Sequence, residues 1–170
     1  MKVDGTSRRA LFFGAASALA LLPFEASTRV KVRFRGVGLP GRGNYSSPDV
    51  LKPDQLEQCV QSEKDINTSS DTLDSTEVAL DKLSTEIERL GQEIDRSAAQ
   101  LDRTSQAAVD GHNAKVQRYQ AMVKDYKARI VGFNSRAEAH NAQLAQFNTN
   151  CANKKYYESD MQAVRSRIRS

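Results

Sequence analysis

The chain has 170 residues, of which 39% are hydrophobic and 27% charged, and its formal net charge at pH 7 is +4. Aromatic residues make up 6%, tryptophan is absent, and the mean hydropathy is −0.60. So little apolar material argues against a large globular core. It favours a solvated helical assembly, in which a narrow apolar stripe packs and most other positions face water.

The first 26 residues differ in character from the rest of the chain. A polar start containing Arg8 and Arg9 precedes an apolar run over residues 10–24, which is shorter than the roughly 20 residues of a membrane-spanning helix. Ser7 and the two arginines before this run resemble the twin-arginine signal pattern. We therefore predict that residues 1–26 are an export signal. A general secretory signal, an uncleaved membrane anchor and an organellar transit peptide are the alternatives.

Residues 27–52 form a basic block with several glycines and prolines, in which six basic side chains face one acidic side chain for a net charge of +5. The basic residues Arg29, Lys31, Arg33 and Arg35 alternate with Val30, Val32 and Phe34. This period of two would place the charges on one face of a short strand, as a basic patch for an anionic envelope surface. Because nothing nearby in the sequence supplies a strand partner, we favour a flexible linker.

Two heptad series follow this linker, the first beginning near Pro53. Its a positions are Cys59, Ile66, Leu73, Leu80, Ile87, Ile94 and Leu101, and its d positions are Ser62, Ser69, Thr76, Leu83, Leu90, Ser97 and Thr104. In the second series the a positions are Val109, Val116, Val123, Ile130, Ala137, Leu144 and Cys151, and the d positions are His112, Tyr119, Tyr126, Phe133, His140 and Phe147. Each series spans about six heptads, which is typical of a coiled coil.

The fold class that follows is all-α: a long antiparallel coiled-coil helical hairpin with a flexible N-terminal arm. Within residues 53–170 we predict helices over about 53–103 and 111–168, joined by a turn over about 104–110. Residues 54–103 carry thirteen acidic and five basic side chains, a net charge of −8, whereas residues 104–170 carry five acidic and eleven basic ones, a net charge of +6. Opposite charges favour pairing within one chain. An antiparallel dimer of longer rods would bury the same positions and stays open.

The only two cysteines, Cys59 and Cys151, lie beyond the predicted signal and indicate a disulfide; two buried free thiols are the alternative. A register that places Leu80 opposite Phe133 packs rings against aliphatic side chains but leaves the cysteines one helical turn apart. A register shifted by one heptad separates them in the other direction. The disulfide therefore predicts a local helix distortion at the open end of the hairpin.

Two further features of the second half leave alternatives open. The turn could lie at Asp110 and Gly111, which have turn-forming side chains. After Cys151 the helical spacing of hydrophobic residues fits either a continued second helix or a short helix folded back on the open end. The arginines near the C-terminus are ordinary complements of a helix dipole, so no nucleic-acid site is predicted.

Asparagine follows a ring in Phe133–Asn134, His140–Asn141 and Phe147–Asn148, and then come Cys151 and the pair Tyr156–Tyr157. This pattern resembles a group of uncharacterised exported bacterial coiled-coil proteins, in which YN or FN units repeat every seven residues before a cysteine and a tyrosine pair. Gln120 and Lys127 stand where that pattern has asparagine. The resemblance implies export and a coiled coil, and it implies no activity.

No set of residues in the sequence predicts a reaction. His112 and His140 would lie about 42 Å apart along one helix, too far to share a metal ion, and we expect them to pack in the core. Nucleophile-elbow, phosphate-loop and zinc-finger spacings are absent from the sequence. We therefore predict no enzyme, no metal site and no cofactor.

The function predicted from the sequence is a periplasmic or secreted structural and interaction module of the bacterial cell envelope. It would present charged faces to a protein partner, alone or as a homo-oligomer. One alternative is an accessory subunit anchored in the membrane by residues 10–24 and facing the periplasm. Another is a chaperone-like helical binding protein.

Overall fold

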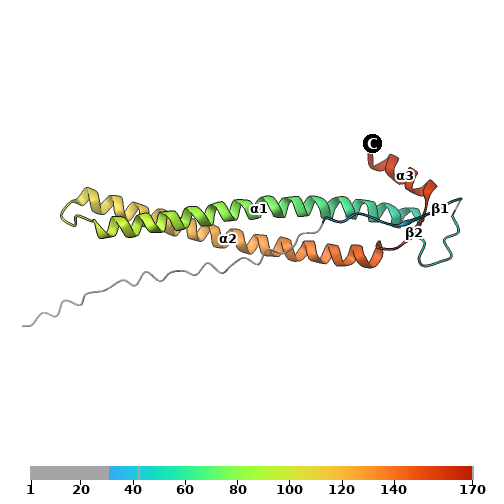
Figure 1. Ribbon diagram of the computed structural model, residues 1–170, viewed down its shortest axis with the longest axis horizontal. Helices are drawn as coiled ribbons and strands as arrows, with labels where there is room; N and C mark the ends of the chain where they lie inside the picture. Colours follow the sequence, from blue (N-terminus) through green and yellow to red (C-terminus); the bar gives the residue numbers. More distant parts are fainter. Residues whose placement is uncertain (1–30, 42, 170) are drawn as a thin grey trace, which may run out of the picture.

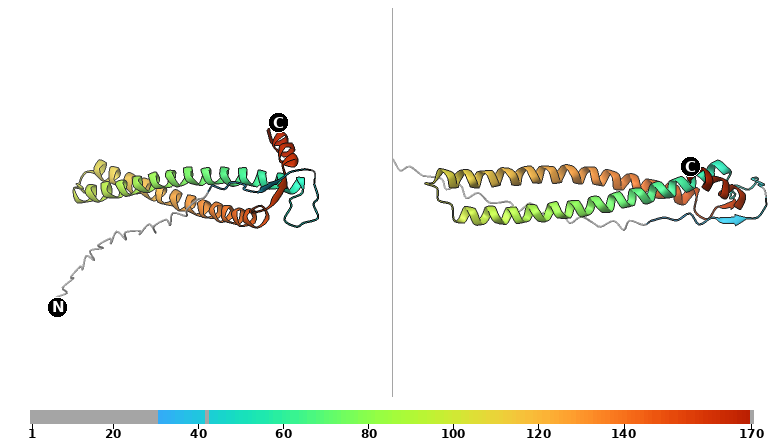
Figure 2. Two further views of the ribbon diagram at one scale, coloured as in Figure 1. Left: turned by 45° about the vertical axis from the view of Figure 1, so that its right-hand side comes forward. Right: turned by 90° about the horizontal axis from the view of Figure 1, so that it is seen from above.

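The computed structural model describes residues 31–41 and 43–169. In chain order its elements are β1 (Val37–Leu39), α1 (Pro53–Ala99), α2 (Gln106–Asn150), β2 (Lys155–Tyr157) and α3 (Glu158–Arg169). The long helices α1 and α2 run antiparallel, side by side in all views, while the two strands and α3 gather at the open end of the hairpin (Figure 1 and Figure 2). The predicted all-α helical hairpin is confirmed. Arg8, Arg9 and Arg29 lie outside the described residues.

The turn between α1 and α2 covers residues 100–105, slightly earlier in the chain than predicted. Asp102 accepts hydrogen bonds from the hydroxyl and the backbone N–H of Thr104, at 2.6 and 2.9 Å, and these bonds lower the pKa of Asp102. The Ser105 hydroxyl then caps α2 by accepting from the N–H of Ala108 at 3.4 Å. With these local bonds in place, Asp110 and Gly111 lie inside α2 and form no turn.

Two histidine–serine pairs define the register of the hairpin. The Nδ1 atom of His140 lies 3.2 Å from the Ser69 hydroxyl, and that of His112 lies 2.8 Å from the Ser97 hydroxyl. The pairs are four heptads apart on both helices, so one register holds along the hairpin. In this register d positions face d positions, and a positions, including the two cysteines, face a positions.

Neither register predicted from the sequence is the observed one. Phe133 lies level with Thr76 rather than with Leu80. The physical reason is size: Ser69, Thr76 and Ser97, which are small d residues of α1, leave room for the rings that face them from the d positions of α2. Cys59 and Cys151 are therefore opposite each other without the predicted local distortion, and α1 is continuous through Cys59.

The buried side chains form two clusters along the hairpin. The cluster at the open end contains Leu51, Leu56, Cys59, Ile66, Phe147, Cys151, Met161 and Val164. The cluster in the middle contains Leu73, Leu80, Ile87, Tyr126 and Phe133. From residue 91 to residue 125 no side chain is fully buried, so the hairpin becomes thinner toward its turn. None of the described helices has an apolar stretch long enough to cross a membrane.

Candidate functional site

The segment before β1 lies in an extended conformation along α1. The N–H of Val32 donates to Oδ1 of Asn67 at 2.9 Å, and Nδ2 of Asn67 donates back to the Val32 carbonyl at 3.0 Å. Two residues later, the N–H of Phe34 donates to Glu63 at 3.1 Å. Four helical residues rise about 6 Å and two extended residues advance about 6.6 Å, so the two spacings match. This docking corrects the expectation of a flexible linker for residues 31–41.

The predicted alternation in this segment is confirmed by burial. Val32 and Phe34 are half-buried against the cluster at the open end, whereas Lys31, Arg33 and Arg35 are exposed. Lys31 forms an ion pair with Asp71 at 2.8 Å, and the hydrogen bond in this pair raises the pKa of the lysine. Arg33 and Arg35 are therefore exposed at the surface, whereas Lys31 is already paired with α1.

Replacing Asn67 with alanine is expected to release residues 31–36 from α1. The change leaves the N–H and the carbonyl of Val32 without their partner, at a cost of about 1–3 kcal/mol per unsatisfied group that stays buried. Trypsin cuts after lysine and arginine, so cleavage after Lys31, Arg33 and Arg35, followed by mass spectrometry, should become faster. The exposed Asn134→Ala on α2 is the matched control. Equal cleavage rates in wild type and Asn67→Ala would contradict this assignment.

The strand partner that the sequence did not indicate comes from the other end of the chain. β1 pairs in parallel with β2, Val37 opposite Lys155 and Leu39 opposite Tyr157. On the other edge of β2, Leu51 N–H donates to the Lys155 carbonyl at 2.8 Å. α2 therefore ends at Asn150, and the prediction that the second helix reaches residue 168 is wrong. Of the two alternatives left open for the C-terminus, the folded-back helix, α3, is the one observed.

Tyr156 and Tyr157 each hold a different part of the amino-terminal segment. The ring of Tyr156 lies 5.6 Å from that of Phe34, centroid to centroid, and a Cβ at Gly36 would come within 2.7 Å of both rings. The Tyr157 hydroxyl accepts from the N–H of Asn44 at 2.8 Å. The tyrosine pair is therefore structural, and Gly36 is required by the close approach of the two rings.

Tyr45 in the same loop donates its hydroxyl proton to Asp160 of α3 at 2.6 Å, which raises the pKa of Tyr45 to about 12. A raised folded-state pKa stabilises the fold below the ordinary value near 10, and this contribution is lost as the pH rises toward 12. We expect Asp160→Asn to lower this pKa. The pKa of Tyr45 is measured by absorbance titration at high pH, as the difference between the protein and its Tyr45→Phe variant. Asp125→Asn is the control and should leave this pKa unchanged. Superimposable Tyr45 titrations in wild type and Asp160→Asn would contradict the contact.

The predicted disulfide between Cys59 and Cys151 is present, with the two Cα atoms 5.6 Å apart. It joins the second turn of α1 to the residue after the last turn of α2. Both cysteines are buried within the open-end cluster, beside the segment that leads into β2. The disulfide therefore closes the hairpin at the same end at which the amino-terminal segment, β2 and α3 assemble.

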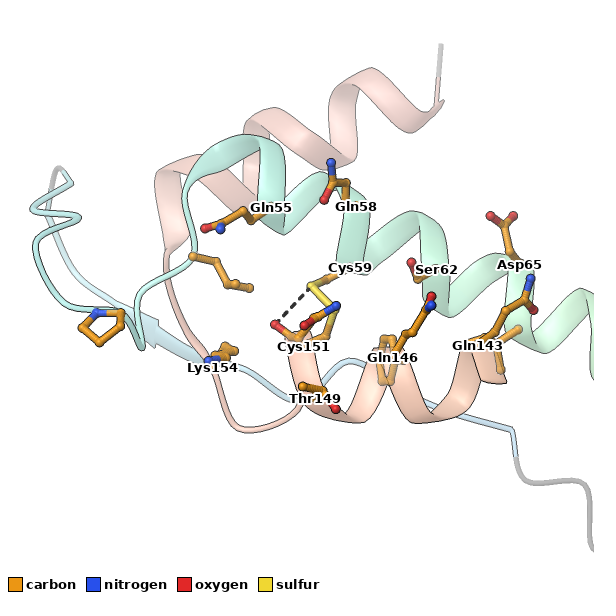
Figure 3. A pocket seen from close by; sticks show the side chains of 15 residues that line it. Gln55, Gln58, Cys59, Ser62, Asp65, Gln143, Gln146, Thr149, Cys151 and Lys154 are labelled. Atoms are coloured by element: carbon orange, nitrogen blue, oxygen red, sulfur yellow. Dashed lines mark hydrogen bonds between the residues drawn. A yellow bond between two sulfur atoms is a disulfide. The ribbon is translucent and has the colours of Figure 1, made fainter. Parts of the chain in front are cut away.

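A cavity of about 640 Å³ lies beside the disulfide, between α1 and α2 (Figure 3). Five carboxamides line it, from Gln55, Gln58, Gln143, Gln146 and Asn150, together with the hydroxyls of Ser62 and Thr149. Leu51, Ile66 and Phe147 supply apolar surface. A second cavity of about 330 Å³ shares Asp65 and Gln143 with the first. We call these two cavities together the amide groove.

The amide groove was not predicted from the sequence. Its glutamines recur three residues apart on each helix, at 55 and 58 and again at 143 and 146, which is also the spacing of an ordinary solvated face. Only the register shows that the two pairs flank the same cavity.

The histidines occupy core positions as predicted, each bonded to a serine of the facing helix. His140 is 2% exposed and lines the second cavity, and its Nε2 atom is buried with no hydrogen-bond partner among the described residues. No group of three His, Cys, Asp or Glu side chains in residues 31–41 and 43–169 is arranged to hold a metal ion.

No protein-family model, curated protein or solved structure matches this chain. The open end of the hairpin brings together a disulfide, a docked basic segment and a carboxamide-lined groove.

Proposed function

We propose that this protein is a non-enzymatic, exported structural and interaction module of the bacterial cell envelope, periplasmic or secreted. Its function is to present the charged faces of a rigid hairpin to a protein partner. The Cys59–Cys151 disulfide carries this proposal, because disulfides persist in oxidising compartments outside the cytoplasm. The resemblance to exported coiled-coil proteins and the signal-like residues 1–26 support the same location.

The charge distribution supports binding through the helix faces. Asp81, Glu88 and Asp95 are exposed and follow one another at seven-residue intervals, so they form one acidic stripe along α1. Exposed charges steer a partner of opposite charge and select against like-charged ones. Arg33 and Arg35 add a basic surface at the open end, which suits attachment to an anionic envelope.

Export is tested by fractionating cells that express the whole chain and measuring the intact mass of the protein without reductant. We expect it in the periplasm or the medium, with an amino terminus near residue 27 and the disulfide formed. A cytoplasmic protein with free thiols and Met1 retained would refute the envelope proposal. An oxidised protein held in the membrane with residues 10–24 intact would instead identify the anchored accessory subunit.

Binding through α1 is tested by placing a photo-crosslinking residue at Glu88 and irradiating the periplasm. We expect one discrete adduct, which disappears when Asp81 and Asp95 are changed to lysine. Reversal of the exposed pair Lys124 and Lys127 on α2 is the matched control and should leave the adduct. An adduct that is insensitive to the charge of the acidic stripe would contradict recognition by this face.

A further inference from the structure

We propose that the amide groove binds an extended polypeptide segment of the partner protein, chiefly through the partner's backbone. This inference rests on the proposed interaction function and adds to it a binding site and a ligand chemistry.

The dimensions of the amide groove suit an extended chain. Its two cavities meet at Asp65 and Gln143 and therefore continue one another along the hairpin. On α1 the lining extends from Gln55 to Thr72, a rise of about 25 Å. An extended peptide advances about 3.3 Å per residue, so about eight residues would span the groove.

The chemistry of the groove matches a peptide backbone. A carboxamide offers both an acceptor oxygen and donor N–H groups, the same pair that every peptide unit presents. Figure 3 shows Gln58 and Ser62 of α1 and Gln146 of α2 around the cavity that holds the disulfide. The charged side chains lining this cavity, Asp65 and Lys154, have opposite signs. Arg136 lines only the second cavity and Lys154 only the first, so the two basic side chains of the groove do not form the single cluster that a phosphorylated or nucleic-acid ligand requires.

The same helix already binds an extended backbone in this way on its other flank. Asn67 bonds both the N–H and the carbonyl of Val32, so a single carboxamide satisfies a whole residue of extended chain. Glu63 and Asn67 lie on one side of the α1 core positions, whereas Gln58 and Asp65 lie on the opposite side. The groove would hold a partner segment in the same way as the side of α1 that carries Glu63 and Asn67 holds residues 31–36.

Side-chain specificity would come from the apolar part of the groove. Leu51, Ile66 and Phe147 line the cavity beside the disulfide. Alternate side chains of an extended segment point to the same side, so every second residue would contact this surface. We expect small apolar residues at those positions, with no requirement for charge.

The probe is a phage-displayed library of random twelve-residue peptides, selected on the oxidised full-length mature protein. One enriched sequence is then synthesised and titrated into ¹⁵N-labelled protein. We expect the side-chain amide resonances of Gln58, Gln143 and Gln146 to shift. Two N-methylated versions of the peptide are compared, one methylated at the odd-numbered and the other at the even-numbered backbone nitrogens. One version should bind at least tenfold more weakly and the other almost unchanged, because only one set of N–H groups faces the groove.

Two matched triple variants locate the site. Gln58→Ala with Gln143→Ala and Gln146→Ala should weaken peptide binding at least tenfold. Gln92→Ala with Gln117→Ala and Gln120→Ala removes three exposed carboxamides that line neither cavity, and it should change binding less than twofold. The resonance shifts in the wild-type protein give the same information without any variant, should the first triple variant fold poorly.

The outcomes separate this inference from the proposed function. Peptides that bind the groove variant as tightly as wild type would overturn the groove and leave interaction through another surface intact. A selection with no enrichment over bare support would also overturn it, while the charge-dependent adduct at Glu88 tests the interaction function independently. Binding of a soluble glycan with the same glutamine shifts, in place of any peptide, would reassign the ligand class.

Discussion

Reduction of the Cys59–Cys151 disulfide is expected to lower the free energy of unfolding by about 4–5 kcal/mol. The bridge closes a chain segment with a sequence separation of 92, and the entropy that it removes from the unfolded chain grows with that length. For a chain of this size the loss corresponds to a decrease in Tm of roughly 10–20 °C. The loss matters for this protein because the folded hairpin has only two modest clusters of buried side chains to stabilise it.

Thermal unfolding followed by circular dichroism, with and without reductant, measures this loss. The Cys59→Ser, Cys151→Ser double variant is the control: it should melt near the reduced wild type, and reductant should not change its Tm. A reduced wild type that melts within about 2 °C of the oxidised protein would contradict the prediction, since that difference corresponds to less than about 1 kcal/mol.

Phe133→Ala is expected to destabilise the hairpin by about 3–5 kcal/mol. Phe133 is 1% exposed and is the largest side chain in the middle cluster that is almost wholly removed from solvent. Its neighbour across the hairpin, level with it in the observed register, is Thr76, which is too small to fill the space that the ring would leave. Chemical denaturation with urea gives the free energy of unfolding directly.

Val131→Ala is the matched control for Phe133→Ala. Val131 lies two residues away on the same helix and is 70% exposed, so its truncation should change the free energy of unfolding by no more than about 0.5 kcal/mol. Similar losses at both positions would mean that helix propensity, rather than packing in the observed register, determines the stability of this region.

The hairpin and its disulfide were predictable because they depend on periodicity and on the number of cysteines. Hydrophobic residues every seven positions predict two helices that pack along one stripe, and two cysteines in the region after a signal-like segment can form only one intrachain pair. Both features are properties of a long stretch of chain, so one irregular residue does not change them.

The register was not predictable from periodicity, because shifting one helix by a few residues leaves the hydrophobic repeat unchanged. The deciding feature is the size of the α1 d residues. Ser69 and Ser97 each face a histidine, and each serine both leaves space for the ring and bonds it. Pairing large rings with large aliphatic side chains, which favoured the other registers, ignores that complementarity.

The open end was the least predictable part, because its contacts join segments that are far apart in sequence. No local pattern indicates that Val37 pairs with Lys155, or that Asn67 bonds the backbone of Val32. The short strands are three residues long and carry no strong strand signal of their own. The amide groove depends in turn on the register, so it could not be predicted before the register was known.

The parallel pairing of β1 with β2 also has a consequence for the order in which the protein folds. Contacts near the turn at residues 100–105 are local, whereas the pairing of β1 with β2 joins residues more than a hundred positions apart. Loop closure costs more entropy as the separation grows, and chains dominated by distant contacts fold more slowly. Folding should therefore start at the turn and end at the disulfide, so that β1, although early in the chain, must wait until residue 155 has been synthesised. A chain truncated before that residue would retain both long helices and leave its amino-terminal segment without a strand partner.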